Sequence, residues 1–174
     1  MSKLTGKKIL AEIVQGKIDI SPFDPKNINP HSYNVTLSNE MIWYNEDYLD
    51  MAKENRYSNK LIPKDGYVLQ PGTLYLARTL ERVHTDYYAP VYDGRSSIGR
   101  LGIFTHVTAG YIDVGFNGFI TLEITVVEPV KIYPNVKIGQ VSFETLEGEI
   151  TLYNSDKYQN NEGIQPSKIW REFL

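Results

Sequence analysis

Short stretches in which apolar and polar residues alternate recur along most of the chain. Between Ser32 and Leu37, the apolar Tyr33, Val35 and Leu37 alternate with polar residues, which is the period of a strand with one buried face. Similar segments, separated by polar turns, are expected at Met41–Tyr44, Tyr67–Gln70, Leu74–Arg78, Ala89–Tyr92, Ile103–Val107, Phe119–Val127, Val130–Ile132 and Val136–Thr145. Short strands at such close spacing predict a mainly β fold, either a sandwich or a barrel.

Two segments carry a helical pattern instead. From Thr5 to Gly16, the apolar Ile9, Leu10, Ile13 and Val14 fall on one face, Thr5 suits the N-cap and Gly16 suits the position after the last turn. A packing role is expected for this helix. A second, short helix is expected from Ser96 to Leu101.

Three segments have no clear period. Pro22–Pro30 is rich in turn residues, and Asn45–Lys60 is polar and charged, so we interpret the latter as a long loop. The segment from Tyr153 to Gly163, followed by Gln165, is too polar to build a core. Composition alone favours a frayed end for this tail.

Composition limits the classes of protein to which the chain can belong. The 174 residues suit one domain, 1–174, and 41% apolar residues with a mean hydropathy of −0.34 suit a soluble protein. No apolar run approaches the ~20 residues of a membrane helix, and the start of the chain does not resemble a signal peptide, so we expect a cytoplasmic protein without membrane partners. The net charge of −3 argues against a general nucleic-acid binder.

The segment Asp93–Glu123 concentrates glycines, hydroxyls, arginines and acids more densely than any other. Gly94-Arg95-Ser96-Ser97 could hold an anion with backbone N–H groups, hydroxyls and a guanidinium together. Glu123 lies inside an apolar run, where an acid points either into a core or into a site. The sequence has no cysteine and none of its three histidines is followed two residues later by glutamate, so the zinc signature of nucleobase deaminases is missing.

Six blocks of sequence, in order, resemble the dCTP deaminase branch of the dUTPase superfamily. They are Pro30–Leu37, Gly94–Gly102, His106–Gly118, Thr121–Glu123, Ile138–Val141 and Lys157–Gly163. The resemblance implies a dUTPase-like β-clip or distorted β-barrel with a few short helices, and a homotrimer with sites between subunits. It also implies dCTP and dUTP as ligands, with dTTP as a candidate inhibitor and Mg²⁺ bound to the triphosphate.

The resemblance assigns roles to residues that match the family's blocks. Glu123 would be the general acid and base that activates a water, with Arg100 and Ser96 beside the reacting centre. His106 receives no proton-transfer role. Residues expected to bind substrate are Arg95, Ser97, Thr108, Ala109, Tyr111, Asp113, Gln140, Tyr153, Lys157, Tyr158 and Asn161, with residues 153–174 forming a lid over the nucleotide.

Two departures from the family pattern bear on these roles. The lid often ends on glutamine where this chain has Asn161, which is one methylene shorter. Where many deaminases have His-Arg before Ile-Asp, this chain has Gly110-Tyr111, as dUTP-hydrolysing relatives have glycine and an aromatic residue there.

Three functions remain open at the level of sequence. The leading one is zinc-independent deamination of dCTP to dUTP and ammonia, which would supply dUTP as a precursor of dTTP. The nearest alternative is a bifunctional enzyme that also hydrolyses dUTP to dUMP and pyrophosphate. The alternative of another class is a nucleotide-binding regulator without catalysis, against which the presence of both Arg100 and Glu123 argues.

Overall fold

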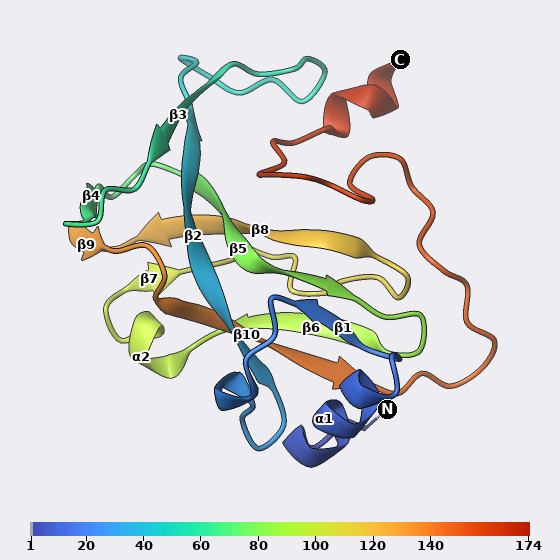
Figure 1. Ribbon diagram of the computed structural model, residues 1–174. Helices are drawn as coiled ribbons and strands as arrows, with labels where there is room; N and C mark the ends of the chain where they lie inside the picture. The colour runs from blue at the N-terminus through green and yellow to red at the C-terminus, as the bar shows by residue number, and fades with distance from the viewer. Residues whose placement is uncertain (1) are drawn as a thin grey trace.

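The computed structural model describes residues 2–174, and most of them build one strongly curved sheet (Figure 1). The helical elements are α1 (Gly6–Val14), η1 (Pro25–Asn27), α2 (Ser96–Gly99) and η2 (Ile169–Phe173). The strands are β1 (Asp19–Ser21), β2 (Tyr33–Tyr44), β3 (Tyr57–Leu61), β4 (Tyr67–Leu69), β5 (Tyr75–His84), β6 (Ala89–Gly94), β7 (Ile103–Phe104), β8 (Asn117–Val126), β9 (Val130–Ile132) and β10 (Lys137–Glu144). The expected mainly β fold with a few short helices is therefore confirmed.

The large sheet closes almost into a barrel. Its strand order is β6-β10-β2-β5-β8-β7, with β1 added beside β5 and β3 beside β2, and every pair is antiparallel. The two edge strands approach each other, since a Cβ added to Gly94 at the end of β6 would lie 3.4 Å from the hydroxyl of Thr105 beside β7. Near-closure protects sheet edges that would otherwise be free to pair with other chains.

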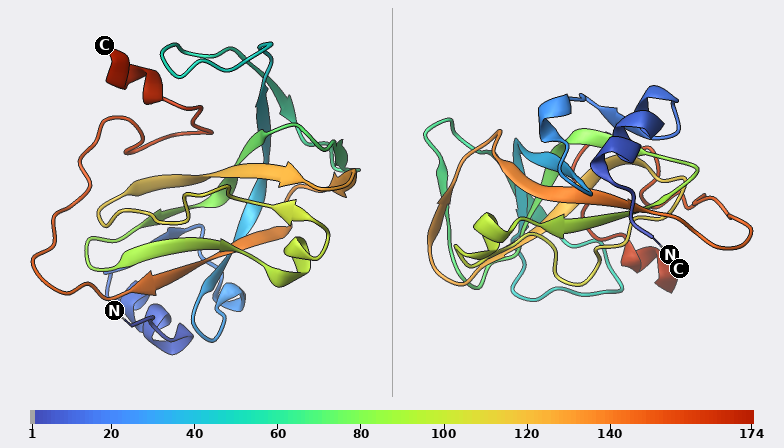
Figure 2. Two further views of the ribbon diagram at one scale, coloured as in Figure 1. Left: turned by 180° about the vertical axis from the view of Figure 1, so that it is seen from behind. Right: turned by 90° about the horizontal axis from the view of Figure 1, so that it is seen from below.

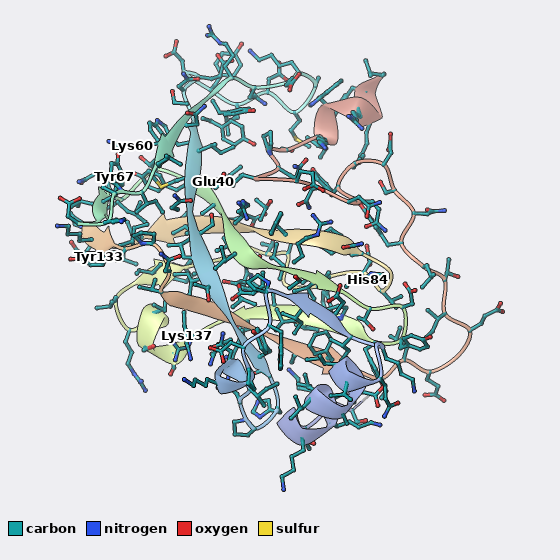
Figure 3. The ribbon with its side chains drawn as sticks, viewed as in Figure 1. Glu40, Lys60, Tyr67, His84, Tyr133 and Lys137 are labelled. Atoms are coloured by element: carbon teal, nitrogen blue, oxygen red, sulfur yellow. The ribbon has the colours of Figure 1, made fainter. Side chains whose placement is uncertain are left out.

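A separate two-stranded sheet, β4-β9, lies at one end of the barrel. The ammonium of Lys60 on β3 lies 4.7 Å from the centre of the Tyr67 ring on β4, so a cation–π contact joins the small sheet to the large one (Figure 3).

Alternation along β8 separates a core face from an outer face. Its even-numbered residues, such as Leu122 and Ile124, are buried in the barrel, whereas Phe119, Thr121 and Glu123 face outward and are half-buried. Successive side chains of a strand point to opposite faces, so these three residues share one surface. That surface is the floor of the larger cavity described below.

The structure corrects several expected element boundaries. The strands expected at Ser32–Leu37 and Met41–Tyr44 are one strand, β2, with an irregular register in the middle. Part of the segment expected to be a loop, Asn45–Lys60, is strand β3, and β1 was not expected at all. Both missed strands are short and mostly polar, and they form because β2 and β5 offer them a pairing edge.

The first helix has the expected caps but a different buried face. The Thr5 hydroxyl accepts from Lys8 N (3.3 Å) and Gly16 adopts a φ of 72°, as predicted. Val14, expected on the buried face, is 81% exposed, whereas Glu12 is fully buried. Among residues 2–174, no helix has the length and apolar character needed to span a membrane.

Glu12 is buried together with the groups that neutralise it. Its carboxylate lies 2.5 Å from Lys8 Nζ and 3.7 Å from Lys17 Nζ, and it accepts a hydrogen bond from Tyr88 (2.7 Å). The hydrogen bonds from Lys8 and Tyr88 hold the pKa of Glu12 below its usual value, and burial beside this carboxylate raises the pKa of Tyr88 to about 12. The cluster attaches α1 to the connection between β5 and β6.

Replacing Glu12→Gln should lower the melting temperature by roughly 5 °C or more at pH 7, because Lys8 and Lys17 lose their buried partner. A group whose pKa is depressed by folding stabilises the protein above its unfolded pKa of about 4.3. The difference in Tm between wild type and Glu12→Gln should therefore shrink as the pH falls through the folded-state pKa. Thermal melts from pH 7 to pH 3, with the exposed Glu149→Gln as control, measure it. A difference that does not change with pH would contradict this assignment.

Candidate functional site

Two cavities contain most of the residues expected at the site, and the larger of them, about 610 Å³, lies over the outward face of β8. Its walls are the turn from Ala109 to Asp113, the loop that precedes β3, and the C-terminal tail. Six of the residues expected from sequence to bind substrate line it together with Glu123: Ala109, Tyr111, Asp113, Tyr153, Tyr158 and Asn161.

Glu123 is held in a fixed orientation at the cavity floor. Its Oε2 accepts a hydrogen bond from the backbone N–H of Val107 (2.9 Å), and its own N–H donates to Thr105 O (3.1 Å). No hydrogen bond of the described residues involves Oε1 of Glu123. One carboxylate oxygen is thus anchored while the other can face a ligand, so it is available to accept a proton from a bound molecule.

The turn that follows His106 is fixed to β6 by backbone hydrogen bonds. Tyr92 N donates to Gly110 O (2.8 Å), and Ile112 N donates to Pro90 O (3.0 Å). Gly110 sits close to β6, since a Cβ there would lie 2.9 Å from Tyr92 O. The turn presents the ring of Tyr111, 84% exposed, and the carboxylate of Asp113 at the cavity edge. Thr108 is also exposed on this turn.

The tail lies along the first half of β8, where β7 does not pair with it, and runs parallel to the strand. Gln159 Oε1 accepts from Asn117 N (2.7 Å), and Asn161 Oδ1 accepts from Phe119 N (3.1 Å). The amide side chains therefore satisfy backbone groups that a neighbouring strand would otherwise pair. Gly118 lets the tail approach this closely, because a Cβ there would lie 2.6 Å from Asn161 Nδ2.

Asn161 has a structural use that the sequence did not indicate. Its Nδ2 donates to Phe119 O (3.2 Å) and to Tyr158 O (3.2 Å), and the side chain is buried. In this conformation the carboxamide clamps the tail to β8 instead of pointing at a ligand.

Of the remaining tail residues expected to bind substrate, Tyr153 and Tyr158 line the larger cavity and Lys157 does not. The ring of Tyr153 packs edge-on against Phe116, with 6.2 Å between ring centres, and Tyr158 accepts from Lys168 N (2.9 Å). The ammonium of Lys157 pairs with Glu172 of η2. Both views of Figure 2 show the tail running outside the sheet before η2 reaches the loop that precedes β3. The tail is thus docked and does not form the frayed end that composition favoured.

A second cavity of about 250 Å³ contains most of the remaining expected residues. Ser96 and Ser97 line it from α2, Arg95 lines it from the position before α2, and Gln140 lines it from β10. Arg95 donates to Lys137 O (3.1 Å), which places the guanidinium against β10 (Figure 3 labels Lys137 next to α2). Gln140 accepts from Ser32 (2.8 Å) and donates to Gly94 O (3.1 Å).

One chain does not bring all of these residues together. Glu123 and Asp113 line the larger cavity, whereas Arg95 and Ser96 line the smaller one, and no described residue lines both. Arg100 is exposed at the end of α2. The structure thus divides the expected site into a half that carries the acid and a half that carries the cations and hydroxyls.

Several lining residues were missed by sequence reasoning. Thr121 and Phe119 could have been found, because they share the alternation of Glu123 along β8. Gln165, whose N–H donates to Thr121 Oγ1 (3.1 Å), and the loop residues Leu49 and Met51 had no such signal.

A metal ion at the larger cavity would be held jointly by a bound ligand and by the protein. Residues 2–174 contain no group of three or more His, Asp or Glu side chains that could hold an ion by themselves. Mg²⁺ commonly binds through substrate phosphates, water and one or two carboxylates, of which Asp113 is available at the cavity edge.

Comparison with solved structures supports the same architecture. The chain is similar to the crystal structure of 2'-deoxycytidine 5'-triphosphate deaminase from Agrobacterium tumefaciens, with a TM-score of 0.66 over 82% of this chain. The two sequences are 21% identical, and the match spans 48% of that chain, so this likeness concerns the fold.

The sequence family follows from closer relatives. The family described as dCTP deaminase-like matches residues 3–146. Proteins named "dCTP deaminase, dUMP-forming" are 53% identical in Clostridium beijerinckii, covering 98% of both chains, and 50% identical in Leptospira biflexa, covering 98% of this chain and 97% of that one. The chain belongs to the dCTP deaminase-like family.

Proposed function

We propose that this protein deaminates dCTP and then hydrolyses the resulting dUTP, so that dUMP, pyrophosphate and ammonia are its products. The observation that carries the deaminase part is Glu123, anchored through one oxygen at the floor of a cavity large enough for a nucleoside. The dUMP-forming names of relatives about half identical to this chain support the second step, as does the Gly110-Tyr111 turn. These observations favour the bifunctional alternative over release of dUTP as the end product.

In the first reaction, water adds to C4 of cytosine and the C4–N4 bond breaks. Glu123 accepts a proton from the water and delivers protons to N3 and to the departing ammonia. The N–H of Val107 holds one carboxylate oxygen throughout, so the other stays aimed at the reacting atoms. Overall, dCTP and water give dUTP and ammonia, and the carboxylate is regenerated.

The neighbours of the reacting centre come, in this proposal, from a second copy of the chain. Ser96 and Arg100 would orient the water and polarise Glu123, while Arg95, Ser97 and Gln140 would contact phosphate. Their separation from Glu123 within one chain supports a shared site. Symmetric closure of such a contact gives a ring, and we propose a homotrimer.

The second reaction requires a water in line with the α-phosphate. Asp113 would orient that water and also accept a hydrogen bond from the sugar 3′-hydroxyl, while Tyr111 packs on the sugar. Thr108 and Ala109 would present backbone groups to the base. Overall, dUTP and water give dUMP and pyrophosphate, with Mg²⁺ neutralising the phosphate charge. The tail, with Tyr153, Lys157 and Tyr158, would close over the nucleotide.

Product analysis tests this function. Enzyme stripped of transition metals and then supplied with Mg²⁺ should convert dCTP into equal amounts of dUMP, pyrophosphate and ammonia, since the donor set for zinc is missing. Chromatography of the nucleotides and an ammonia assay follow the reaction.

Three results would contradict parts of the proposal. Stable dUTP as the end product would contradict the second reaction and leave deamination as the only activity. Turnover that depends on added zinc would contradict the proposal that deamination is independent of zinc. Tight dCTP binding without ammonia release would favour the non-catalytic regulator.

A further inference from the structure

Arg82 lies on the outward face of β5 and has no role in the function proposed above. Its Nη1 donates to the backbone carbonyl of Asn161 in the tail (2.8 Å) and to Glu162 Oε1 (3.3 Å), and its Nη2 donates to Asn117 Oδ1 on β8 (3.3 Å). Of the barrel residues that the structure describes, it is the only charged one whose side chain donates a hydrogen bond to the tail, residues 153–174. A hydrogen bond from an ionised donor is roughly twice as strong as one between neutral groups.

The guanidinium of Arg82 is held in place by its cross-strand neighbour. Arg82 is paired with Phe119 of β8, and its Cζ lies 5.1 Å from the centre of the Phe119 ring. Arg78, on the same face of β5, lies 4.2 Å from the centre of the same ring. Its hydrogen bonds, however, go to Glu40 and to Thr79 O. The two arginines therefore share a strand, a face and an aromatic partner, but of the two only Arg82 donates to the tail.

The contact of Arg82 continues to the larger cavity through Asn161. The backbone carbonyl of Asn161 accepts from Arg82, while its carboxamide bonds both Phe119 N and Phe119 O. The same carboxamide donates to Tyr158 O (3.2 Å), and Tyr158 lines the larger cavity. A shift of Asn161 away from β8 would therefore also displace Tyr158.

We propose that Arg82 is a positioning residue: it holds the tail against β8 and thereby fixes the place of Tyr158 at the nucleotide site. The inference rests on the function proposed above, because the position of Tyr158 matters to the reaction only if the larger cavity binds the nucleotide. Arg82 itself does not touch the reacting atoms. When its charge is removed, the tail keeps its neutral hydrogen bonds, so it docks in the same way but detaches from β8 more often.

Amide hydrogen exchange tests this role without any turnover. The informative amides are those of Tyr153, Asn160 and Gln165, which donate hydrogen bonds from the tail to β8 or to the turn before it. In nucleotide-free Arg82→Gln these amides should exchange about tenfold faster than in wild type, the order expected when a hydrogen bond to a charged group is lost. Amides of β10, which the tail does not cover, should keep their wild-type rates.

Steady-state kinetics with dCTP measures the consequence for the reaction. The KM of Arg82→Gln should rise about fivefold, because fewer molecules carry the tail in the position that is competent to bind. Its kcat should stay within about twofold of wild type, since a bound nucleotide draws the tail back onto β8 at saturation. A barrel that is merely less stable would not separate the two constants in this way.

The matched control is Arg78→Gln, which removes the other guanidinium from the Phe119 ring and should change neither tail exchange nor KM, whatever its effect on Tm. Glu162→Gln removes only an exposed ion pair of Arg82 and should also behave as wild type. Arg82→Lys keeps the charge but loses the planar fork, so its tail exchange should lie between wild type and Arg82→Gln. It replaces Arg82→Gln if that variant does not fold.

Three results would overturn the inference. Equal acceleration of tail exchange in Arg82→Gln and Arg78→Gln would make Arg82 a stabiliser of the barrel only. Unchanged tail exchange in Arg82→Gln would show that neutral hydrogen bonds suffice to hold the tail. Faster exchange with an unchanged KM would mean that the tail does not take part in binding the nucleotide. Wild type that does not turn over dCTP would instead contradict the proposed function, and the exchange experiment distinguishes that failure because it needs no substrate.

Discussion

Glu123→Gln should lose at least about a thousandfold in the rate of ammonia release, within the range that general acid–base groups contribute. The amide is nearly isosteric, but it cannot accept the proton of the attacking water. Val107 N–H can still donate to the side-chain oxygen of glutamine, so the geometry of the cavity floor should persist. Binding of dCTP, measured by calorimetry, should change by less than about threefold, since the lost step is chemical.

The matched control is Glu128→Gln, an exposed glutamate just beyond the end of β8. It should behave as wild type in both assays. Retention of most ammonia release by Glu123→Gln would mean that another group activates the water. Loss of both binding and activity would instead assign Glu123 a structural role.

Mixing two inactive variants should restore activity if the site is shared between copies. Glu123→Gln leaves the half-site on α2 intact, and Arg100→Gln leaves the half-site in the larger cavity intact. In assemblies that form at random from equal amounts, about a quarter of the sites combine an intact glutamate with an intact arginine. Co-expressed and co-purified variants should therefore recover about a quarter of the wild-type rate.

Each variant assembled only with itself provides the baseline and should remain inactive. Mixed assemblies that stay at this baseline, with both variants present by mass spectrometry, would show that each chain builds its whole site alone. The smaller cavity would then belong to some other contact.

The sequence was sufficient for the secondary structure wherever local periodicity is strong. Thr5 and Gly16 delimit α1, and the alternation around Tyr33 and along β8 defines strands, because these signals depend on near neighbours in the chain. Elements without a strong local pattern, β1 and β3, could not be found, because their pairing partners are distant in sequence. The sequence also did not predict that Glu12 is buried and Val14 exposed. One partner of the buried Glu12 is Tyr88, which is far along the chain.

For the site, the sequence determined which residue types are present, and its ordered blocks indicated the family. Only the tertiary structure decided how they are grouped. It placed Glu123 in one cavity and Ser96 in another, used Asn161 to clamp the tail, and brought Met51 to the cavity from a loop without any pattern. The physical reason is that such groupings depend on long-range strand pairing and on the path of the tail, which no short stretch of sequence encodes.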